Sequence, residues 1–195
     1  LHITLVNFKL RHICVFSIEK LMKSKKNIVF LGMMGSGKSS IGFLVSKRLQ
    51  IDFVDIDDYI EQNLGMKISE IFKSKGESFF RQIEEKITLK ILKRNNIVIS
   101  LGGGSFLNKN IRKEVLINHL SFWLKLNSQT LISRIINNKK RPLAIGATEE
   151  QLNNLIKKRS NIYSKALFKI NCNGLTKVEV VKKVINIYEN KKIIS

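Results

Sequence analysis

Apolar residues follow two different periods along the chain. Five short apolar runs predict buried strands, at residues 28–31, 51–55, 97–101, 121–126 and 168–172. Between them, apolar residues that recur every three or four positions predict helices. Five have both ends predicted, at residues 59–63, 78–93, 108–117, 148–164 and 176–189, and two more are predicted to begin at residue 38 and at residue 127 or 128. A short helix is also expected between Ser69, as its cap, and Gly76. Strands that alternate with helices in this way indicate an α/β protein.

The first predicted strand leads into a glycine-rich loop, Gly32-Met-Met-Gly-Ser-Gly-Lys-Ser39, and then into a helix. This spacing between a strand and a helix is the pattern of a phosphate-binding loop. Glycines let backbone N–H groups surround phosphate oxygens, and the helix N-terminus adds a positive dipole end. Lys38 is expected to reach the β- and γ-phosphates, and the Ser39 hydroxyl to ligate Mg²⁺. An ordinary glycine-rich turn is the alternative, but the flanking elements favour a nucleoside triphosphate site made by Gly35, Ser36, Gly37, Lys38, Ser39 and Ser40.

Three carboxylates follow the second predicted strand, at Asp55, Asp57 and Asp58. Asp55 and Asp57 point the same way in extended chain, toward the crevice where α/β proteins bind ligands. One is expected to hold Mg²⁺ through water, and the other to accept a hydrogen bond or a proton from a substrate hydroxyl. The alternative role for such a carboxylate is to cap the next helix, and we assign that role to Asp58.

Three glycines, Gly102 to Gly104, follow the third predicted strand. Without side chains there, a substrate can lie against bare backbone beside the phosphate loop, although a flexible turn is the alternative. This strand lacks the metal-binding Asp with which many nucleotide hydrolases end the corresponding strand. The acidic residues stand after the second strand instead, which points away from that subclass.

Two arginines have unusual positions. Arg81 and Glu84 are three residues apart on a predicted helix and can form an ion pair. Glu84 borders the apolar stripe, which favours a partly buried pair, and a solvated surface pair is the alternative. Arg159 lies seven residues after Leu152, on the inward face of its helix. A buried guanidinium needs an anion, so either a buried carboxylate or a substrate carboxylate is expected to meet Arg159.

The segment from residue 137 to 146 is polar and basic and contains the only proline of the chain. Such a segment predicts a mobile surface loop, and its functional version is a lid over about residues 137–148. Arg141 in this lid is a candidate arginine finger for a transferring phosphoryl group. A solvated basic loop is the alternative.

Composition narrows the class of protein further. The chain has 195 residues, of which 44% are hydrophobic and 26% charged, and no apolar run approaches the ~20 residues of a membrane span. Cys14 and Cys172 share no motif, so no disulfide framework or zinc site is indicated, which suits the cytoplasm. Residues 1–21 are expected to be a poorly ordered extension before a single domain at 22–195.

The formal net charge of +20 favours anionic ligands. Its basic residues are spread along the chain, and no aromatic-rich strand or nucleic-acid-binding motif accompanies them. We therefore expect an anionic nucleotide and an anionic small molecule as ligands, and no nucleic acid or membrane partner.

Taken together, the motifs resemble those of shikimate kinases. The resemblance covers about residues 26–190 and is carried, besides the phosphate loop, by Asp55-Ile-Asp57, Phe80-Arg81-Gln-Ile-Glu84-Glu85, Gly102-Gly-Gly104, Arg141-Pro-Leu143 and Lys158-Arg159. It implies a P-loop fold: a three-layer α/β/α sandwich with a lid and a five-stranded parallel sheet in the order 2-3-1-4-5. Residues 1–21 have no counterpart in this pattern.

The resemblance also implies a reaction, the transfer of a phosphoryl group from ATP to the 3-hydroxyl of shikimate in aromatic amino acid biosynthesis, by a monomer. By the same resemblance, Asp57 is the candidate base, while Arg81, Arg159 and the glycines Gly102, Gly103 and Gly104 bind shikimate. Glu84 orients Arg81, whereas Lys38 and Arg141 stabilise the phosphoryl group. Arg134 lies near adenine, and Ser39 and Asp55 hold Mg²⁺. The alternatives are another small-molecule kinase, for gluconate or a nucleoside monophosphate, and a nucleic-acid-associated ATPase.

Overall fold

Five parallel strands form one sheet in the computed structural model, which describes residues 26–136 and 147–193. The strands are β1 (Ile28–Leu31), β2 (Asp52–Asp55), β3 (Ile97–Ser100), β4 (Leu120–Lys125) and β5 (Phe168–Asn171). Their spatial order is β2-β3-β1-β4-β5, as predicted. In register, Val29 of β1 lies between Ile99 of β3 and Ser121 of β4, so the strand before the glycine-rich loop is at the centre of the sheet.

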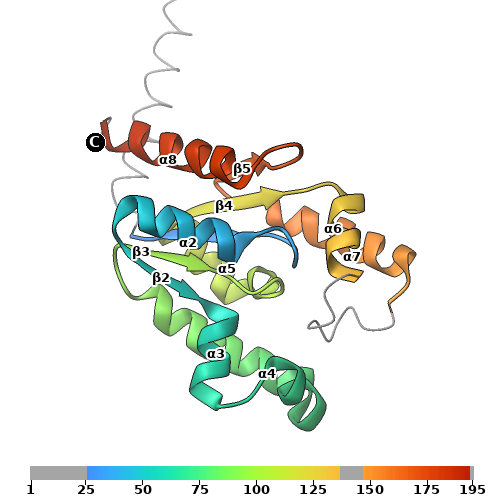
Figure 1. The fold of residues 1–195 in the computed structure, drawn as a ribbon. Helices are drawn as coiled ribbons and strands as arrows, with labels where there is room; N and C mark the ends of the chain where they lie inside the picture. The colour runs from blue at the N-terminus through green and yellow to red at the C-terminus, as the bar shows by residue number, and fades with distance from the viewer. Residues whose placement is uncertain (1–25, 137–146, 194–195) are drawn as a thin grey trace, which may run out of the picture.

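Helices cover both faces of this sheet (Figure 1). They are α2 (Lys38–Leu49), α3 (Ile56–Leu64), α4 (Ile68–Leu92), α5 (Lys109–Asn118), α6 (Ser128–Ile136), α7 (Glu149–Tyr163) and α8 (Lys177–Ile193), with a 3₁₀ turn η1 (Ser105–Leu107). Helix α2 packs against α8, whereas α5 packs against α4. Figure 1 shows α2 and α5 on opposite sides of the strands, which confirms the three-layer α/β/α sandwich.

The central strands are buried on both of their faces. All four residues of β1 and all four of β3 are buried, because helices cover the sheet above and below. Aromatic rings continue the core sideways from β1 through β4 to β5: the Phe30 and Phe122 ring centroids are 5.7 Å apart, and those of Phe122 and Phe168 are 4.9 Å apart. This rigid centre fixes the loops that leave the carboxyl ends of the strands.

The helix starts differ from the predicted ones at two places. Helix α3 begins at Ile56, and Asp55 is its cap, because the Asp55 Oδ1 accepts the N–H of Asp57 at 3.0 Å and that of Asp58 at 3.4 Å. The assignment of Asp58 as the cap was therefore wrong. The carboxylate one residue before the helix reaches the free N–H groups, whereas Asp58 already lies inside the first turn.

Ser69 was likewise wrong as the next cap, because α4 begins at Ile68. The Glu70 carboxylate accepts the N–H of Lys67, and the Glu61 carboxylate accepts that of Ile68. Gly76 does break the helical path, with φ 81° and ψ 169°, and the chain then continues as the second part of α4. Of the two residues expected to cap α6, Asn127 or Ser128, Asn127 is the cap, since it accepts the N–H of Thr130. Asn108 and Thr148 also each accept an N–H of the first turn of their helix.

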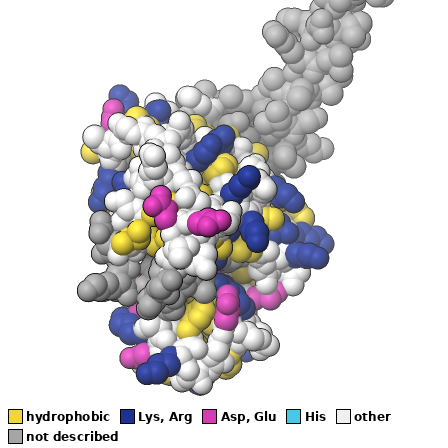
Figure 2. All heavy atoms as spheres, turned by 90° about the vertical axis from the view of Figure 1, so that its right-hand side faces the viewer, with side chains coloured by type: hydrophobic (Ala, Val, Ile, Leu, Met, Phe, Trp, Pro, Cys, Tyr) yellow, Lys and Arg dark blue, Asp and Glu magenta, His cyan; other side chains and the backbone are white. Residues whose placement is uncertain are grey.

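Two predicted segments cannot be placed. The extension at residues 1–21 and most of the lid, with Arg141, lie outside the described residues. Within the described residues, every helix is too short or too polar to cross a membrane. On the face that Figure 2 shows, Lys and Arg side chains lie at several separate places with acidic side chains among them.

Candidate active site

A pocket with an empty volume of about 440 Å³ lies beyond the carboxyl ends of the central strands. It is lined by Met34, Asp57, Ile68, Phe72, Phe80, Arg81, Glu84, Gly103, Gly104 and Arg159. These residues come from the phosphate loop, α3, α4, the loop after β3, and α7, which are far apart in the sequence. The structure thus brings Asp57, both arginines and two of the three glycines to one place, and carboxylate, guanidinium and aromatic groups share its wall.

The phosphate loop lies directly beside this pocket, since Met34 belongs to both. Gly35 and Gly37 have φ values of 79° and 91°, which side chains with a Cβ rarely adopt. The Lys38 side chain is buried and its Nζ donates to the Met33 carbonyl at 3.1 Å, inside the loop that a phosphate would fill. Ser39 and Ser40 are exposed in the first turn of α2. This is a helix N-terminus with its cation in place, as a polyphosphate site requires.

A second pocket, of about 390 Å³, lies on the other side of the loop. Ser36, Gly37, Ser40 and Arg134 line it, together with Ile41, Leu126, Cys172, Leu175, Lys177 and Val180. The Arg134 guanidinium donates to the Gly35 carbonyl at 3.1 Å, which attaches α6 to the loop. Burial raises the pKa of the Cys172 thiol to about 11, so this thiol lines the pocket in its uncharged form at neutral pH. An apolar wall next to an arginine and a phosphate loop suits the base end of a nucleotide.

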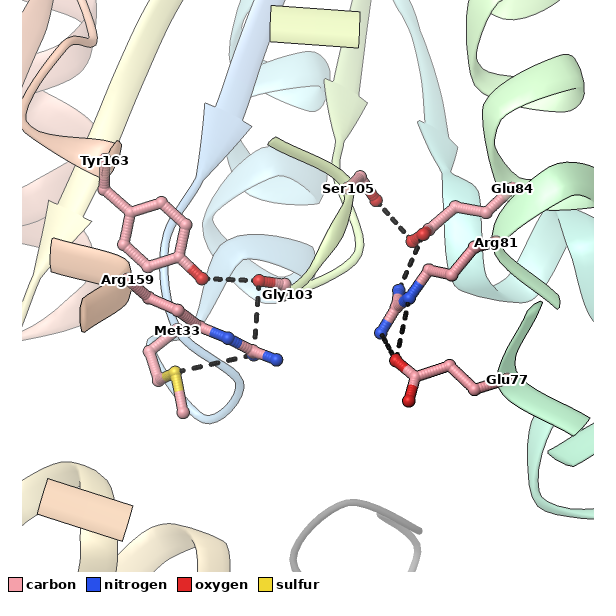
Figure 3. Close-up of polar contacts among 8 residues, drawn as sticks. All are labelled: Met33, Glu77, Arg81, Glu84, Gly103, Ser105, Arg159 and Tyr163. Atoms are coloured by element: carbon pink, nitrogen blue, oxygen red, sulfur yellow. Dashed lines mark hydrogen bonds and ion pairs between the residues drawn. The ribbon is translucent and has the colours of Figure 1, made fainter. Parts of the chain in front are cut away.

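Arg81 is held by carboxylates on two sides (Figure 3). Its Nη1 donates to the buried Glu84 at 2.7 Å, and its Nε and Nη2 both donate to Glu77 Oε1, at 3.1 and 3.0 Å. The other Glu84 oxygen accepts the Ser105 hydroxyl at 2.6 Å. The predicted Arg81–Glu84 pair is therefore confirmed and partly buried.

Burial and pairing act in opposite directions on these groups. Burial raises the pKa of Glu84, and Arg81 and Ser105 oppose this rise only in part. Burial lowers the pKa of Arg81, but Glu84 and Glu77 outweigh that effect and leave it above its ordinary value. The Arg81 guanidinium is thus a fixed cation whose charge is largely balanced by its own chain.

Arg159 is buried without a carboxylate partner among the described residues. Only 6% of the residue is exposed, and its Nε makes no hydrogen bond to the part of the chain that the structure describes. Its Nη1 has two long contacts with neutral acceptors, the Gly103 carbonyl at 3.4 Å and the Met33 sulfur at 3.8 Å. The inward position of Arg159 is confirmed, and of the two anions considered from the sequence, no buried Asp or Glu meets it within the described residues.

The three glycines have two roles, of which only one was expected. A Cβ on Gly102 would lie 2.5 Å from the Asp57 Oδ1, and one on Gly104 would lie 2.6 Å from the Arg81 Nη1. Gly102 is absent from the pocket wall, whereas Gly103 and Gly104 line it. Only part of this segment therefore offers bare backbone to a ligand, and the rest makes room for the acid and the arginine that face the ligand.

Asp55 and Asp57 have different surroundings in the structure. Asp57 lines the pocket, whereas Asp55 caps α3 through Oδ1 and keeps Oδ2 without a hydrogen bond to a described residue. Within the described residues there is no cluster of three or more His, Cys, Asp or Glu that could hold a metal ion. Any ion here would need ligand atoms from the nucleotide or from water in addition to these side chains.

Three site residues were not found from the sequence. Glu77 is four residues before Arg81 on one helix, and that spacing is a signal that could have found it. Tyr163, whose hydroxyl donates to the Gly103 carbonyl, is likewise four residues after Arg159 on α7. Ser105 has no comparable signal, because its partner Glu84 is 21 residues away.

Comparisons with known proteins agree with one another. A family model described as shikimate kinase matches residues 34–189. A shikimate kinase of Thermodesulfovibrio yellowstonii is 42% identical over 165 residues, which are 84% of this chain and 95% of that protein. The solved structure of a shikimate kinase from Acinetobacter baumannii in complex with shikimate is similar, with a TM-score of 0.81 and 26% identity over 89% of this chain and 98% of that one. A shikimate kinase structure from Aquifex aeolicus has a TM-score of 0.77 and 31% identity, over 87% and 99% of the two chains.

Proposed function

This chain belongs to the shikimate kinase family, and we propose that it transfers the γ-phosphoryl group of ATP to the 3-hydroxyl of shikimate. The products are shikimate 3-phosphate and ADP, and the reaction belongs to aromatic amino acid biosynthesis. The family implies ATP as the co-substrate.

The observation that carries the proposal is the state of Arg159. A buried guanidinium with an unpaired Nε and no carboxylate partner among the described residues is unfavourable unless a ligand supplies the anion. Arg159 lines the same pocket as Asp57 and Arg81, which therefore offers two guanidinium groups for one carboxylate and one carboxylate for hydroxyl groups. Shikimate is a small ring acid with one carboxylate and three hydroxyls, and the aromatic rings of Phe72 and Phe80 give its ring an apolar wall.

The nucleotide occupies the other side of the phosphate loop in this proposal. The backbone N–H groups of Gly35, Ser36 and Gly37 and the following turn surround the phosphates, and Lys38 moves from the Met33 carbonyl to the β- and γ-phosphates. Arg134 and the apolar wall of the second pocket hold the base. The terminal phosphate then points past Met34 toward the pocket that holds the acid.

In the chemical step, the 3-hydroxyl oxygen of shikimate forms a bond to the γ-phosphorus, and the bond from that phosphorus to the β–γ bridging oxygen breaks. The electron pair of the broken bond stays with ADP. We assign Asp57 as the acceptor of the hydroxyl proton, because it lines the acid pocket beside the phosphate loop. Lys38 stabilises negative charge on the phosphoryl oxygens.

Mg²⁺ fits the residues that remain. The Ser39 hydroxyl is exposed in the first turn of α2, and Oδ2 of Asp55, which accepts no hydrogen bond from a described residue, offers a second hard oxygen. These two would hold the ion directly or through water. When bound, Mg²⁺ supplies charge neutralisation between the β- and γ-phosphates. A role for Arg141, the monomeric state and a cytoplasmic location stay predictions from the sequence.

An acceptor-specificity assay tests the proposal. ADP release is followed by a coupled assay with ATP and Mg²⁺, and shikimate, gluconate and nucleoside monophosphates are offered in turn. We expect turnover with shikimate only, and we expect Lys38→Ala to abolish it. Preference for gluconate or a nucleotide, or hydrolysis that nucleic acid stimulates without an acceptor, would reject the assignment.

A further inference from the structure

Tyr163 is the largest polar side chain next to the pocket that the reaction does not use. It lies at the end of α7, one turn after Arg159, and only 2% of it is exposed. Its ring packs at a tilt against the ring of Trp123 on β4, with centroids 6.1 Å apart. Its hydroxyl donates to the carbonyl oxygen of Gly103, which is 60 residues away in the sequence (Figure 3).

The Gly103 carbonyl is also an acceptor for Arg159. The Arg159 Nη1 reaches it at 3.4 Å, a long contact, and the Tyr163 hydroxyl donates to the same oxygen. One oxygen therefore has two donors among the described residues, the neutral Tyr163 hydroxyl and the charged Arg159 guanidinium at the limit of hydrogen-bond distance. Burial raises the pKa of Tyr163 to about 12, so its hydroxyl keeps its proton and stays a donor at any working pH.

We propose that Tyr163 is a positioning residue for the acid substrate, because its hydroxyl satisfies the Gly103 carbonyl and so leaves Arg159 free to face the pocket. Without that hydroxyl, Arg159 is the donor that remains to the carbonyl among the described residues, and a buried carbonyl draws a donor toward itself. The guanidinium then turns toward the glycine segment, and fewer of its N–H groups face a carboxylate in the pocket. This inference rests on the proposed function, in which Arg159 binds the carboxylate of shikimate.

The same hydrogen bond also fixes the pocket wall. Gly103 and Gly104 line the pocket, and an atom in the place of a Gly103 Cβ would be 3.3 Å from the backbone nitrogen of Met34. The Gly103 peptide thus lies between the phosphate loop and α7. Tyr163 holds it from the side of α7, so the distance between the acid and the phosphate depends on this contact as well.

Tyr163→Phe tests the proposal, because it removes the hydroxyl and keeps the ring. We expect kcat/KM for shikimate to fall about three- to tenfold, through a higher KM for shikimate, with kcat and the KM for ATP within about twofold of the wild type. Tyr59→Phe is the matched control, since the Tyr59 hydroxyl makes no hydrogen bond with the described residues and lies outside the pocket wall. The control should leave all constants unchanged.

A double-variant cycle separates positioning from a merely structural role. If Tyr163 acts through Arg159, then Tyr163→Phe in an Arg159→Met background changes kcat/KM for shikimate by less than about twofold. An equal loss in both backgrounds would overturn the proposal, as would an unchanged KM for shikimate together with a lower melting temperature. A wild-type enzyme that does not turn over shikimate would instead reject the proposed function, and the two failures are therefore distinguishable.

Discussion

Arg81 and Arg159 lie on opposite sides of one pocket (Figure 3), yet their charges are balanced in different ways. Arg81 is paired with Glu77 and Glu84, whereas Arg159 contacts a carbonyl, a sulfur and the Tyr163 hydroxyl, and no carboxylate, among the described residues. The paired arginine is satisfied in the free protein, whereas the one without a carboxylate partner among the described residues is expected to gain such a partner from a bound anion. We therefore expect Arg81 to serve mainly as a fixed donor, and Arg159 to supply most of the attraction for the acid.

The difference also concerns stability. A buried, uncompensated cation destabilises the folded state, so Arg159 is a site where binding is favoured at the expense of stability in the free protein. Arg81 has the opposite effect, because its removal would leave the buried Glu84 without its cation. The two arginines are thus expected to respond differently to the same substitution.

The largest effect is expected from Arg159→Met, which removes the charge and keeps much of the volume. kcat/KM for shikimate should fall about 100-fold, since charge-assisted hydrogen bonds are worth about 1.5–3 kcal/mol. The KM for ATP should stay within about twofold, because in the proposed function the nucleotide lies on the other side of the phosphate loop. Initial rates of ADP release at varied shikimate and ATP measure both. Equal losses for the two substrates would show that Arg159 is structural.

The next effect is on the free energy of unfolding without ligands. Arg81→Met should lower it by about 2–3 kcal/mol, because Glu84 loses its ion pair inside the protein. Arg159→Met should leave it unchanged or raise it by up to about 1–2 kcal/mol. Urea unfolding of the wild type and both variants measures the differences. If Arg159→Met lost as much stability as Arg81→Met, the two sides of the pocket would not differ as described.

A smaller effect is expected from Glu77→Gln. Glu77 is half exposed and neutralises part of the Arg81 charge, so its removal should make the pocket more attractive to an anion. kcat/KM for shikimate should rise about two- to threefold at low salt, and the gain should disappear at about 0.5 M salt. Glu85→Gln removes the same charge from the same helix, with its partners Asn108 and Asn110 elsewhere, and serves as the control. A lower kcat/KM would mean that Glu77 positions Arg81 instead of competing for it.

The smallest effect concerns the pH dependence of stability. Burial raises the pKa of Glu84 above its ordinary value of 4.5, so the folded state binds this proton more readily than the unfolded state. Its contribution to stability is present below that value and is lost as the pH rises through the raised pKa. The unfolding free energy of the wild type minus that of Glu84→Gln should therefore decrease from about pH 4 upward. A difference that increases with pH would mean that pairing with Arg81 outweighs burial.

The sequence predicted most of the architecture because the relevant signals are local or belong to a family pattern. The apolar runs located all five strands, and the spacing of Arg159 after Leu152 placed that arginine inside. The cap of α3 was wrong because Asp55, Asp57 and Asp58 are equivalent by composition. Only the path of the backbone decides which carboxylate lies one residue before the helix.

The partners of the two arginines were harder to predict. Ser105 meets Glu84, and Tyr163 meets Gly103, across 21 and 60 residues, and both contacts depend on how α4 and α7 pack beside the loop after β3. A periodic pattern shows that a side chain points inward but does not show which atom it meets. The imbalance between Arg81 and Arg159 therefore became visible only in three dimensions.

The central claim is that the unpaired charge of Arg159 binds the carboxylate of shikimate, and its most direct test compares shikimate with its neutral methyl ester. kcat/KM for the two acceptors is measured with the wild type and with Arg159→Met in the same ADP-release assay. The account predicts that the wild type prefers the acid by roughly 100-fold and that the preference falls to a few-fold in the variant. A preference of the same size in both proteins, or none in the wild type, would contradict it.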